Sequence, residues 1–163
     1  MIDAYRCIIT KRDTRTYADK PIPAEALHRI LQAGRMAGSA KNTQPWRFVL
    51  LEERARKEEL AACGQFAAHI PSAPVLVAIV MPSESRDFDA GRSAQNMMLT
   101  AWAEGITSCP VAMHDQECAR RVLGVPEGHR VSIVIAFAYP PAVPRPPGVP
   151  RVALDELLHR EGW

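Results

Sequence analysis

The most informative stretch of this sequence reads Gly38-Ser39-Ala40-Lys41-Asn42-Thr43-Gln44-Pro45-Trp46. It separates a segment of helical periodicity from a segment that is typical of a strand. A simple connector needs turn formers, and the glycine, serine and asparagine of this stretch would suffice. It also holds Gln44 and Trp46, which we expect at the surface. Small residues let a flat ligand come close and amides supply donors and acceptors, so the stretch indicates a binding wall.

The sequence on either side of this stretch alternates between helical and strand patterns. Helices are predicted at residues 2–10, 54–62, 87–105, 115–123 and 154–159, and a further helix follows Pro23 and includes residues 27–34. Strands are predicted at residues 46–51, 74–81 and 131–138, while residues 106–113 fit a strand or a loop. The continuously apolar run at 74–81 should be buried on both faces of a sheet. Because no regular βαβ rhythm is present, the pattern favours an α+β fold or a mixed sheet in one domain, residues 1–163.

Two helices have legible apolar faces. One follows Pro23 and carries the face Leu27, Ile30, Leu31 and Gly34. The other spans residues 87–105, and its residues at three- and four-residue steps are Phe88, Gly91, Gln95, Met98, Leu99 and Trp102. In each case the spacing is that of one side of a helix.

The C-terminal part of the chain changes in character after Tyr139. Six prolines lie between residues 140 and 150, so this segment should be extended and cannot pair as a central strand. Such a tail can lie across its own domain or reach a second copy of the chain. Composition supports both interpretations equally.

Composition and charge exclude several classes of protein. The net charge of +2 is small and the basic residues are scattered, so no nucleic-acid partner is expected. No apolar run is long enough to span a membrane as a helix, and the first residues lack the apolar core of a signal peptide. The four cysteines form no C-x-x-C pair, which argues against a zinc site and suits a reducing cytosol. We therefore expect a cytoplasmic protein without a metal site.

The cluster Lys11-Arg12-Asp13-Thr14-Arg15 places three basic groups within one helical turn. It can be a solvated helix end whose cations favour the C-terminal dipole. It can also be a phosphate clamp, because guanidinium groups match phosphate oxygens. The cluster by itself favours the helix end.

The sequence contains no recognisable motif for a catalytic centre built from side chains. No G-x-G-x-x-G, Walker loop, G-x-S-x-G or HExxH motif is present. Cys109 has no nearby base, and buried thiols are usually inert. If the protein is an enzyme, a cofactor should therefore supply the chemistry and no catalytic side chain is assigned.

Several segments together resemble the nitroreductase family of flavin-dependent oxidoreductases. Residues 11–15 resemble its R-R-S/D-x-R motif, and residues 37–46 its A-P-S-x-x-N-x-Q-P-W. Gln95-Asn96-Met97-Met98-Leu99 with the following Ala103 to Ile106 resembles Q-N-L-L-L…A-x-x-x-G-L. Ser108 to Val111 resembles the strand that leads to the flavin edge, and the segments at 124–128 and 151–163 complete the order.

This resemblance implies a three-layer fold with a mainly antiparallel central sheet flanked by helices. It also implies a homodimer that holds FMN at its interface, with the C-terminal tail crossing to the partner subunit. Such a protein would transfer a hydride from NAD(P)H through FMN to a nitroaromatic, a quinone or a related electrophilic small molecule. With the resemblance included, the phosphate interpretation of the basic cluster overtakes the helix-end interpretation.

The resemblance also implies which residues bind FMN. Those for the phosphate are Lys11, Arg12, Arg15 and Arg151. Asp13 would lie beside the ribityl chain or the ring. The other subunit would line the ring and ribityl chain with Gly38, Ser39, Ala40 and Asn42. The other ring face and its edge would meet Pro110, Val111, Ala112, Met113 and, as a weaker candidate, Gln65, with N–H groups near Ala112 and Met113 directed at flavin N5 and O4.

Three departures from the family pattern bear on activity. Gly38 replaces a proline, Lys11 replaces an arginine, and Met113 stands where glycine is common. The chain also lacks the helical excursion that often covers the active site. These features motivate an alternative, a flavin-binding or flavin-storage protein, or a flavin-modifying relative, without nitroreductase turnover. A structural interaction module, supported only by the proline-rich tail, is a third hypothesis.

Overall fold

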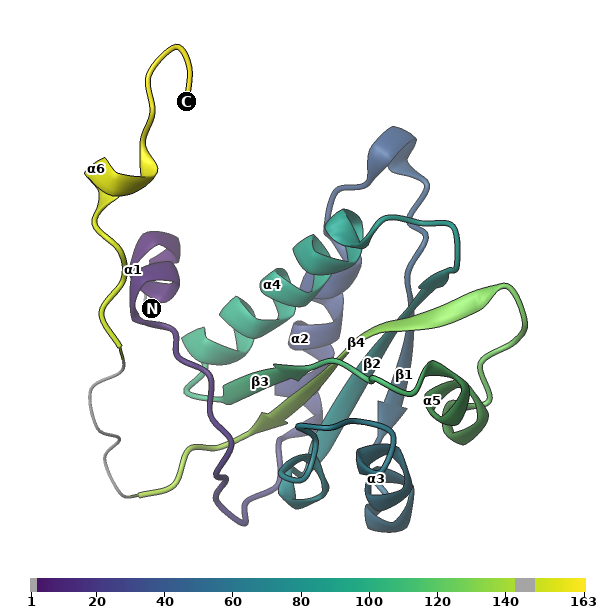
Figure 1. Ribbon diagram of the computed structural model, residues 1–163. Helices are drawn as coiled ribbons and strands as arrows, with labels where there is room; N and C mark the ends of the chain where they lie inside the picture. The colour runs from purple at the N-terminus through teal and green to yellow at the C-terminus, as the bar shows by residue number, and fades with distance from the viewer. Residues whose placement is uncertain (1–2, 143–148) are drawn as a thin grey trace.

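The computed structural model describes residues 3–142 and 149–163, and its centre is a four-stranded antiparallel sheet in the order β1-β2-β4-β3 (Figure 1). The strands are β1 (Arg47–Leu51), β2 (Val75–Pro82), β3 (Thr107–Val111) and β4 (His129–Ala138). The helices are α1 (Ala4–Thr10), α2 (Ala24–Arg35), α3 (Arg54–Ala61), α4 (Asp87–Ala103), α5 (Gln116–Leu123) and α6 (Leu154–Leu157). The predicted α+β fold with an antiparallel sheet is confirmed, and residues 107–111 are a strand.

Helices cover both faces of the sheet, which gives three layers (Figure 1). Strand β2 shows why, because successive side chains point to opposite faces. Val77 and Ile79 pack into the cluster with α2 and α4, while Leu76 and Ala78 pack into the cluster with α3 and α5. The first seven residues of β2 are buried, so the predicted burial on both faces is confirmed.

The face of α2 identified in the sequence lies toward the core. Ile30 and Gly34 are buried, and Leu27 and Leu31 pack against the same cluster. A Cβ added to Gly34 would lie 2.1 Å from Met97 Cε and 2.8 Å from Met97 Cγ. Gly34 therefore lets α2 approach α4 closely, and the buried Ser93 hydroxyl donates a 3.0 Å hydrogen bond to the Gly34 carbonyl across the same contact.

The predicted helix α4 is confirmed, but in its first half the residues at three- and four-residue steps are not the buried ones. Phe88 is 75% exposed, and Gly91 and Gln95 also face outward. The buried positions are mostly small, and they are Ala90, Ser93, Ala94, Met97, Met98 and Ala101. Small side chains allow α4 to lie close to the sheet and to α2, and this close packing leaves no room inside for a ring at position 88.

Trp46 is also placed differently from the prediction. Its side chain is 5% exposed and belongs to the core cluster beneath α2. The residue precedes an edge strand, and burying an indole there removes a large apolar area from water. Trp46 thus anchors the end of the 38–46 stretch and does not serve as a surface group.

Cys63 and Cys118 form a disulfide that joins the residues after α3 to α5. The pair was not foreseen because its members are 55 residues apart, and only short spacings such as C-x-x-C can be recognised in a sequence. Cys7 and Cys109 are free and buried. Disulfides are rare in the cytosol, so the cysteines give no support to the predicted reducing compartment.

The tail differs little from its prediction where it is described. Residues 149–163 are exposed, and α6 is shorter than the predicted helix. Three of its six prolines, Pro144, Pro146 and Pro147, lie outside the described residues. Within residues 3–142 and 149–163, every helix is too short or too polar to cross a membrane.

Replacing Gly34 with alanine tests the close contact of α2 and α4. The added methyl group must displace Met97, so we expect the free energy of unfolding to fall by about 1–3 kcal/mol, offset by up to about 1 kcal/mol of helix propensity. Chemical denaturation measures the change. In a Met97→Ala background the Gly34→Ala substitution should cost nothing further, and an equal cost in both backgrounds would contradict the contact.

Breaking the disulfide should destabilise the fold. Closing a loop of this length restricts the unfolded chain, so Cys118→Ser should lower the free energy of unfolding by about 2–4 kcal/mol. Dithiothreitol should cause the same loss in the unsubstituted protein and none beyond it in the variant. A thiol titration of the unfolded, unreduced protein that counts all four cysteines as free would show that the bond does not form.

Candidate functional site

The predicted phosphate-binding segment lies along the outer edge of β3. The Thr14 N–H donates a 3.0 Å hydrogen bond to the Ser108 carbonyl, and Asp13 forms an isolated parallel bridge with Ser108. The Thr14 side chain is buried and shares a hydrogen bond with the Thr107 hydroxyl. Because side chains alternate along an extended chain, burial of Thr14 turns Asp13 and Arg15 outward on the opposite side.

Lys11 and Asp13 form an ion pair at the start of this segment. The Lys11 side chain is only 11% exposed, and its Nζ lies 3.5 Å from Met98 Sδ on α4. Lys11 is therefore held between the segment and the helix, and its charge is partly balanced by Asp13. This position suits a lysine, whose point charge attracts an anion but cannot bind it through two parallel hydrogen bonds as an arginine does.

The Arg12 side chain is directed at the end of α1. Its guanidinium donates hydrogen bonds to the carbonyls of Ile9, at 3.0 Å, and of Lys11, at 2.8 Å. These contacts lie at the last turn of α1, where carbonyl groups lack helical partners. The helix-end interpretation of the basic cluster thus describes Arg12, although its side chain remains exposed.

Arg15 extends over the middle of β3. Burial raises the pKa of the Cys109 thiol, and a hydrogen bond from Arg15 acts in the opposite direction. Burial also lowers the pKa of His69, and the nearby Arg15 charge lowers it further. Both effects place the exposed Arg15 guanidinium close to β3 and to His69.

The predicted flavin-edge segment follows β3 directly. Pro110 and Val111 end the strand, Ala112 is exposed, and Met113 is 4% exposed with its side chain in the core. Because the Met113 side chain points inward, its bulk does not cover the outer surface of the segment. Residues 11–15 and 110–113 are therefore assembled along the same strand.

The turn after α3 packs against this segment. The Gln65 N–H donates a 3.1 Å hydrogen bond to His114 Nδ1, and the Asp115 N–H donates a 3.0 Å bond to the Cys63 carbonyl. A Cβ at Gly64 would lie 3.3 Å from the Ala112 carbonyl oxygen, so glycine permits this approach. The structure thus places Gln65, the weakest of the predicted residues, beside residues 110–113.

The loop at residues 38–42 is fixed by hydrogen bonds to itself and to α4. The Ser39 hydroxyl accepts a 2.9 Å bond from the Gln44 N–H, and Asp89 accepts a 3.4 Å bond from the Ala40 N–H. Lys41 and Asn42 have φ values of 51° and 55°, in the left-handed region that non-glycine residues rarely adopt. Such backbone strain is common at ligand-binding loops.

The two groups of predicted residues do not meet within one chain. The loop contacts α4 at Asp89, whereas Lys11 contacts it at Met98, 98 − 89 = 9 residues further along. Nine helical residues span roughly 14 Å. Figure 1 shows the loop with η1 (Ala40–Asn42) near the opposite end of α4 from α1. Arg151 is exposed and has no described bond to the basic cluster.

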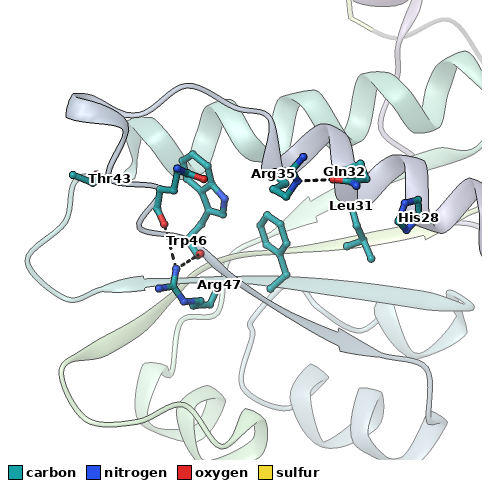
Figure 2. Close-up of a pocket in the computed structure, with 9 residues that line it drawn as sticks. His28, Leu31, Gln32, Arg35, Thr43, Trp46 and Arg47 are labelled. Atoms are coloured by element: carbon teal, nitrogen blue, oxygen red, sulfur yellow. Dashed lines mark hydrogen bonds between the residues drawn. The ribbon is translucent and has the colours of Figure 1, made fainter.

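A separate hollow of about 630 Å³ lies between α2 and β1 (Figure 2). Its wall includes His28, Arg35 and Arg47, over the aromatic residues Trp46 and Phe48. The strand order puts β1 at the opposite edge of the sheet from β3. The hollow therefore does not belong to the group formed by residues 11–15 and 110–113.

Three residues near the predicted site were not predicted to belong to it. Ser108 Oγ and His69 Nε2 are buried without a hydrogen-bond partner among the described residues. Arg92 on α4 lies against the backbone of Gly38. No local motif marks a buried orphan atom, but the unexpected glycine at position 38 was a signal that another side chain occupies this space.

Comparison with known proteins identifies the family. The model of the Nitroreductase family matches residues 8–82 and 72–139, which cover most of the chain. The chain belongs to the nitroreductase family. Its fold is the nitroreductase fold, and family membership assigns the chain as an oxidoreductase.

Individual relatives agree with this assignment. An NADH dehydrogenase of Thermus thermophilus is 29% identical over 182 residues, 86% of this chain and 88% of the relative. An FMN-dependent nitroreductase from Clostridium difficile superposes with a TM-score of 0.86 at 22% identity, over 96% and 98% of the two chains. The NADPH:FMN oxidoreductase of Vibrio harveyi, complexed with NAD+, has a TM-score of 0.87 at 23% identity, over 98% and 77%. At these identities the two structures establish the likeness of fold.

The effect of the Arg15 charge on the pKa of His69 can be measured by titration. Arg15→Gln should raise the pKa of His69 toward its ordinary value near 6.5, because a repelling charge is removed. The folded-state pKa lies below the unfolded-state value, so protonation of His69 opposes folding and the free energy of unfolding falls as the pH drops below about 6.5. Arg15→Gln should lessen that fall.

Nuclear magnetic resonance of the histidine ring protons gives the pKa directly. Arg12→Gln is the matched control, since the Arg12 guanidinium is directed at the end of α1. It should leave the pKa of His69 unchanged. Identical His69 titration curves in the two variants would contradict the placement of Arg15 over β3.

Proposed function

We propose that the chain is an FMN-dependent NAD(P)H oxidoreductase that acts as a homodimer. The observation that carries the proposal is the hydrogen bond from Thr14 to Ser108. It holds the basic segment along the strand that ends in residues 110–113, so the groups expected at the two ends of one flavin are assembled on the same strand.

The chemistry of the donor set fits the phosphate end of FMN. Lys11 and Arg15 supply two cations beside β3, and Asp13 is the carboxylate that pairs with Lys11. Arg15 is exposed and offers a planar fork of donors for phosphate oxygens. Arg12 and, from the tail, Arg151 are proposed to complete the phosphate site.

The ring end is proposed to lie over residues 110–113. Ala112 is exposed while the Met113 side chain is buried, so the Met113 side chain does not cover the segment, and Gln65 flanks it. The N–H groups near Ala112 and Met113 would donate to flavin N5 and O4 and so favour the reduced ring. When bound, FMN would accept a hydride from NAD(P)H and pass the electrons to a nitroaromatic, a quinone or a related electrophile.

The separation of the two residue groups supports a homodimer. Gly38, Ser39, Ala40 and Asn42 lie at the other end of α4 from the basic segment, and we propose that they reach the flavin from a second copy. Some of the exposed apolar residues are consistent with burial against such a copy, and these include Tyr5, Ile8, Ile9, Phe88, Leu154, Leu157 and Trp163. The exposed tail is proposed to cross to the partner, as terminal exchange often does in dimers.

The test of this function begins with the absorption spectrum of the purified protein. We expect a yellow protein, and Arg15→Ala should weaken FMN binding by about 10- to 100-fold, the loss of one or two hydrogen bonds to a charged group. Quenching of FMN fluorescence gives the dissociation constant. Arg54→Ala, which removes an exposed arginine paired with Glu58 on α3, should leave FMN binding unchanged.

The same preparation separates the proposed enzyme from the alternatives. A protein that binds FMN but does not oxidise NADH or NADPH with an added nitro compound or quinone would be a flavin-binding protein without turnover. A colourless protein that cannot be reconstituted with FMN would contradict the proposal altogether. The cytoplasmic location remains a prediction, which fractionation of cells would test.

A further inference from the structure

The Arg92 guanidinium fills the space that a side chain at residue 38 would occupy. A Cβ added to Gly38 would lie 2.5 Å from one terminal nitrogen of the Arg92 guanidinium and 3.0 Å from its central carbon. Both distances are shorter than a van der Waals contact allows. The guanidinium therefore lies against the backbone at the start of the 38–42 loop, and it does so because residue 38 has no side chain.

The charge of Arg92 is not neutralised within the described part of the chain. Arg92 takes part in no hydrogen bond or ion pair among residues 3–142 and 149–163, and its one described partner is the Phe88 ring at 5.8 Å. The nearest acidic residue in the sequence, Asp89, accepts from the Ala40 N–H. Arg92 is also exposed, so its fork of donors is available to a ligand.

The position of Arg92 is set by two different contacts. Asp89 and Arg92 are three residues apart on α4, so both side chains project from the same side of the helix. Asp89 fixes the loop at Ala40, and Gly38 admits Arg92 two residues earlier. An unpaired cation on α4 therefore lies against the first residue of the loop that is proposed to line the flavin ring.

We propose that Arg92 is a specificity-determining residue that favours a substrate bearing a carboxylate or a phosphate. This inference rests on the proposed function, in which residues 38–40 border the flavin ring. A guanidinium beside that border would meet the substrate bound over the ring and bind its oxyanion through two parallel hydrogen bonds. The oxyanion can be a carboxylate of the acceptor or the 2′-phosphate of NADPH.

Two matched substrate pairs distinguish these sources. For the acceptor, 4-nitrobenzoate is compared with the neutral 4-nitrobenzamide. For the donor, NADPH is compared with NADH. In the FMN-loaded protein, Arg92→Gln should raise the KM of either 4-nitrobenzoate or NADPH about tenfold, because one charge-assisted hydrogen bond is lost. The kcat, and the KM of the matched substrate that lacks this oxyanion, should stay unchanged.

Gly38→Ala provides a second variant that keeps the charge. The added methyl group must displace the Arg92 guanidinium, and residue 38 has no positive φ that would oppose alanine. The preference for the charged substrate should fall in this variant as well. Arg121→Gln is the matched control, because Arg121 is an exposed arginine on α5. It should change neither KM.

Equilibrium binding gives a readout that is independent of turnover. Calorimetry with benzoate and with 2′-phosphoadenosine should show weaker binding of one of these anions to oxidised Arg92→Gln than to the unsubstituted protein. Equal binding of both anions in the two proteins, with unchanged ratios of KM, would overturn the inference.

Two other outcomes would also overturn it. If Arg92→Gln weakens the dimer in sedimentation experiments and leaves the substrate ratios unchanged, Arg92 pairs with a second copy of the chain. If charged and neutral substrates are affected equally, Arg92 shapes the loop and does not recognise an anion. Failure of the unsubstituted protein to bind FMN or to turn over would instead refute the proposed function, so the two failures are distinguishable.

Discussion

The backbone hydrogen bond between Thr14 and Ser108 is the contact on which the candidate site depends. It converts a short polar segment after α1 into a neighbour of β3, and the buried Thr14 side chain fixes which residues face outward. Lys11, Asp13 and Arg15 are thereby presented together, although nothing in their own sequence would hold them in one plane. Strand β3 thus positions the basic segment relative to the residues that follow the strand.

Helix α4 is the second organising element, because it contacts both groups of candidate residues. Its inner side is built from alanine, serine and methionine, which lets it pack tightly on the sheet and on Gly34. Its outer side carries Phe88 and Arg92, next to the strained loop at Lys41 and Asn42. The tight inner packing determines where this loop is held, so core geometry and site geometry are connected through one helix.

The sequence predicted the elements of the fold better than their contacts. Strand β2 and helix α2 were recognisable because continuous burial and a 3.6-residue period leave direct traces in the order of residues. The orientation of α4 was not, since the hydrophobic pattern favours large side chains and the packing here requires small ones. Trp46 and the Cys63–Cys118 pair depend on which distant segments meet. For the site, local motifs indicated residues 11–15 and 38–42, but the different directions of the Arg12 and Arg15 side chains depend on neighbouring carbonyls and on β3, which no local motif reveals.

The position of β1 at the edge of the sheet bears on the tendency of the chain to aggregate. Strand β1 pairs only with β2 among the described residues, so its other side presents free N–H and C=O groups. Its sequence is apolar after Arg47, which is its one charged residue. Exposed edges of this kind recruit strands from other chains, and a single basic residue is a weak deterrent. The open edge of β1 is therefore the part of the sheet at which chains at high concentration are most prone to pair with one another and aggregate.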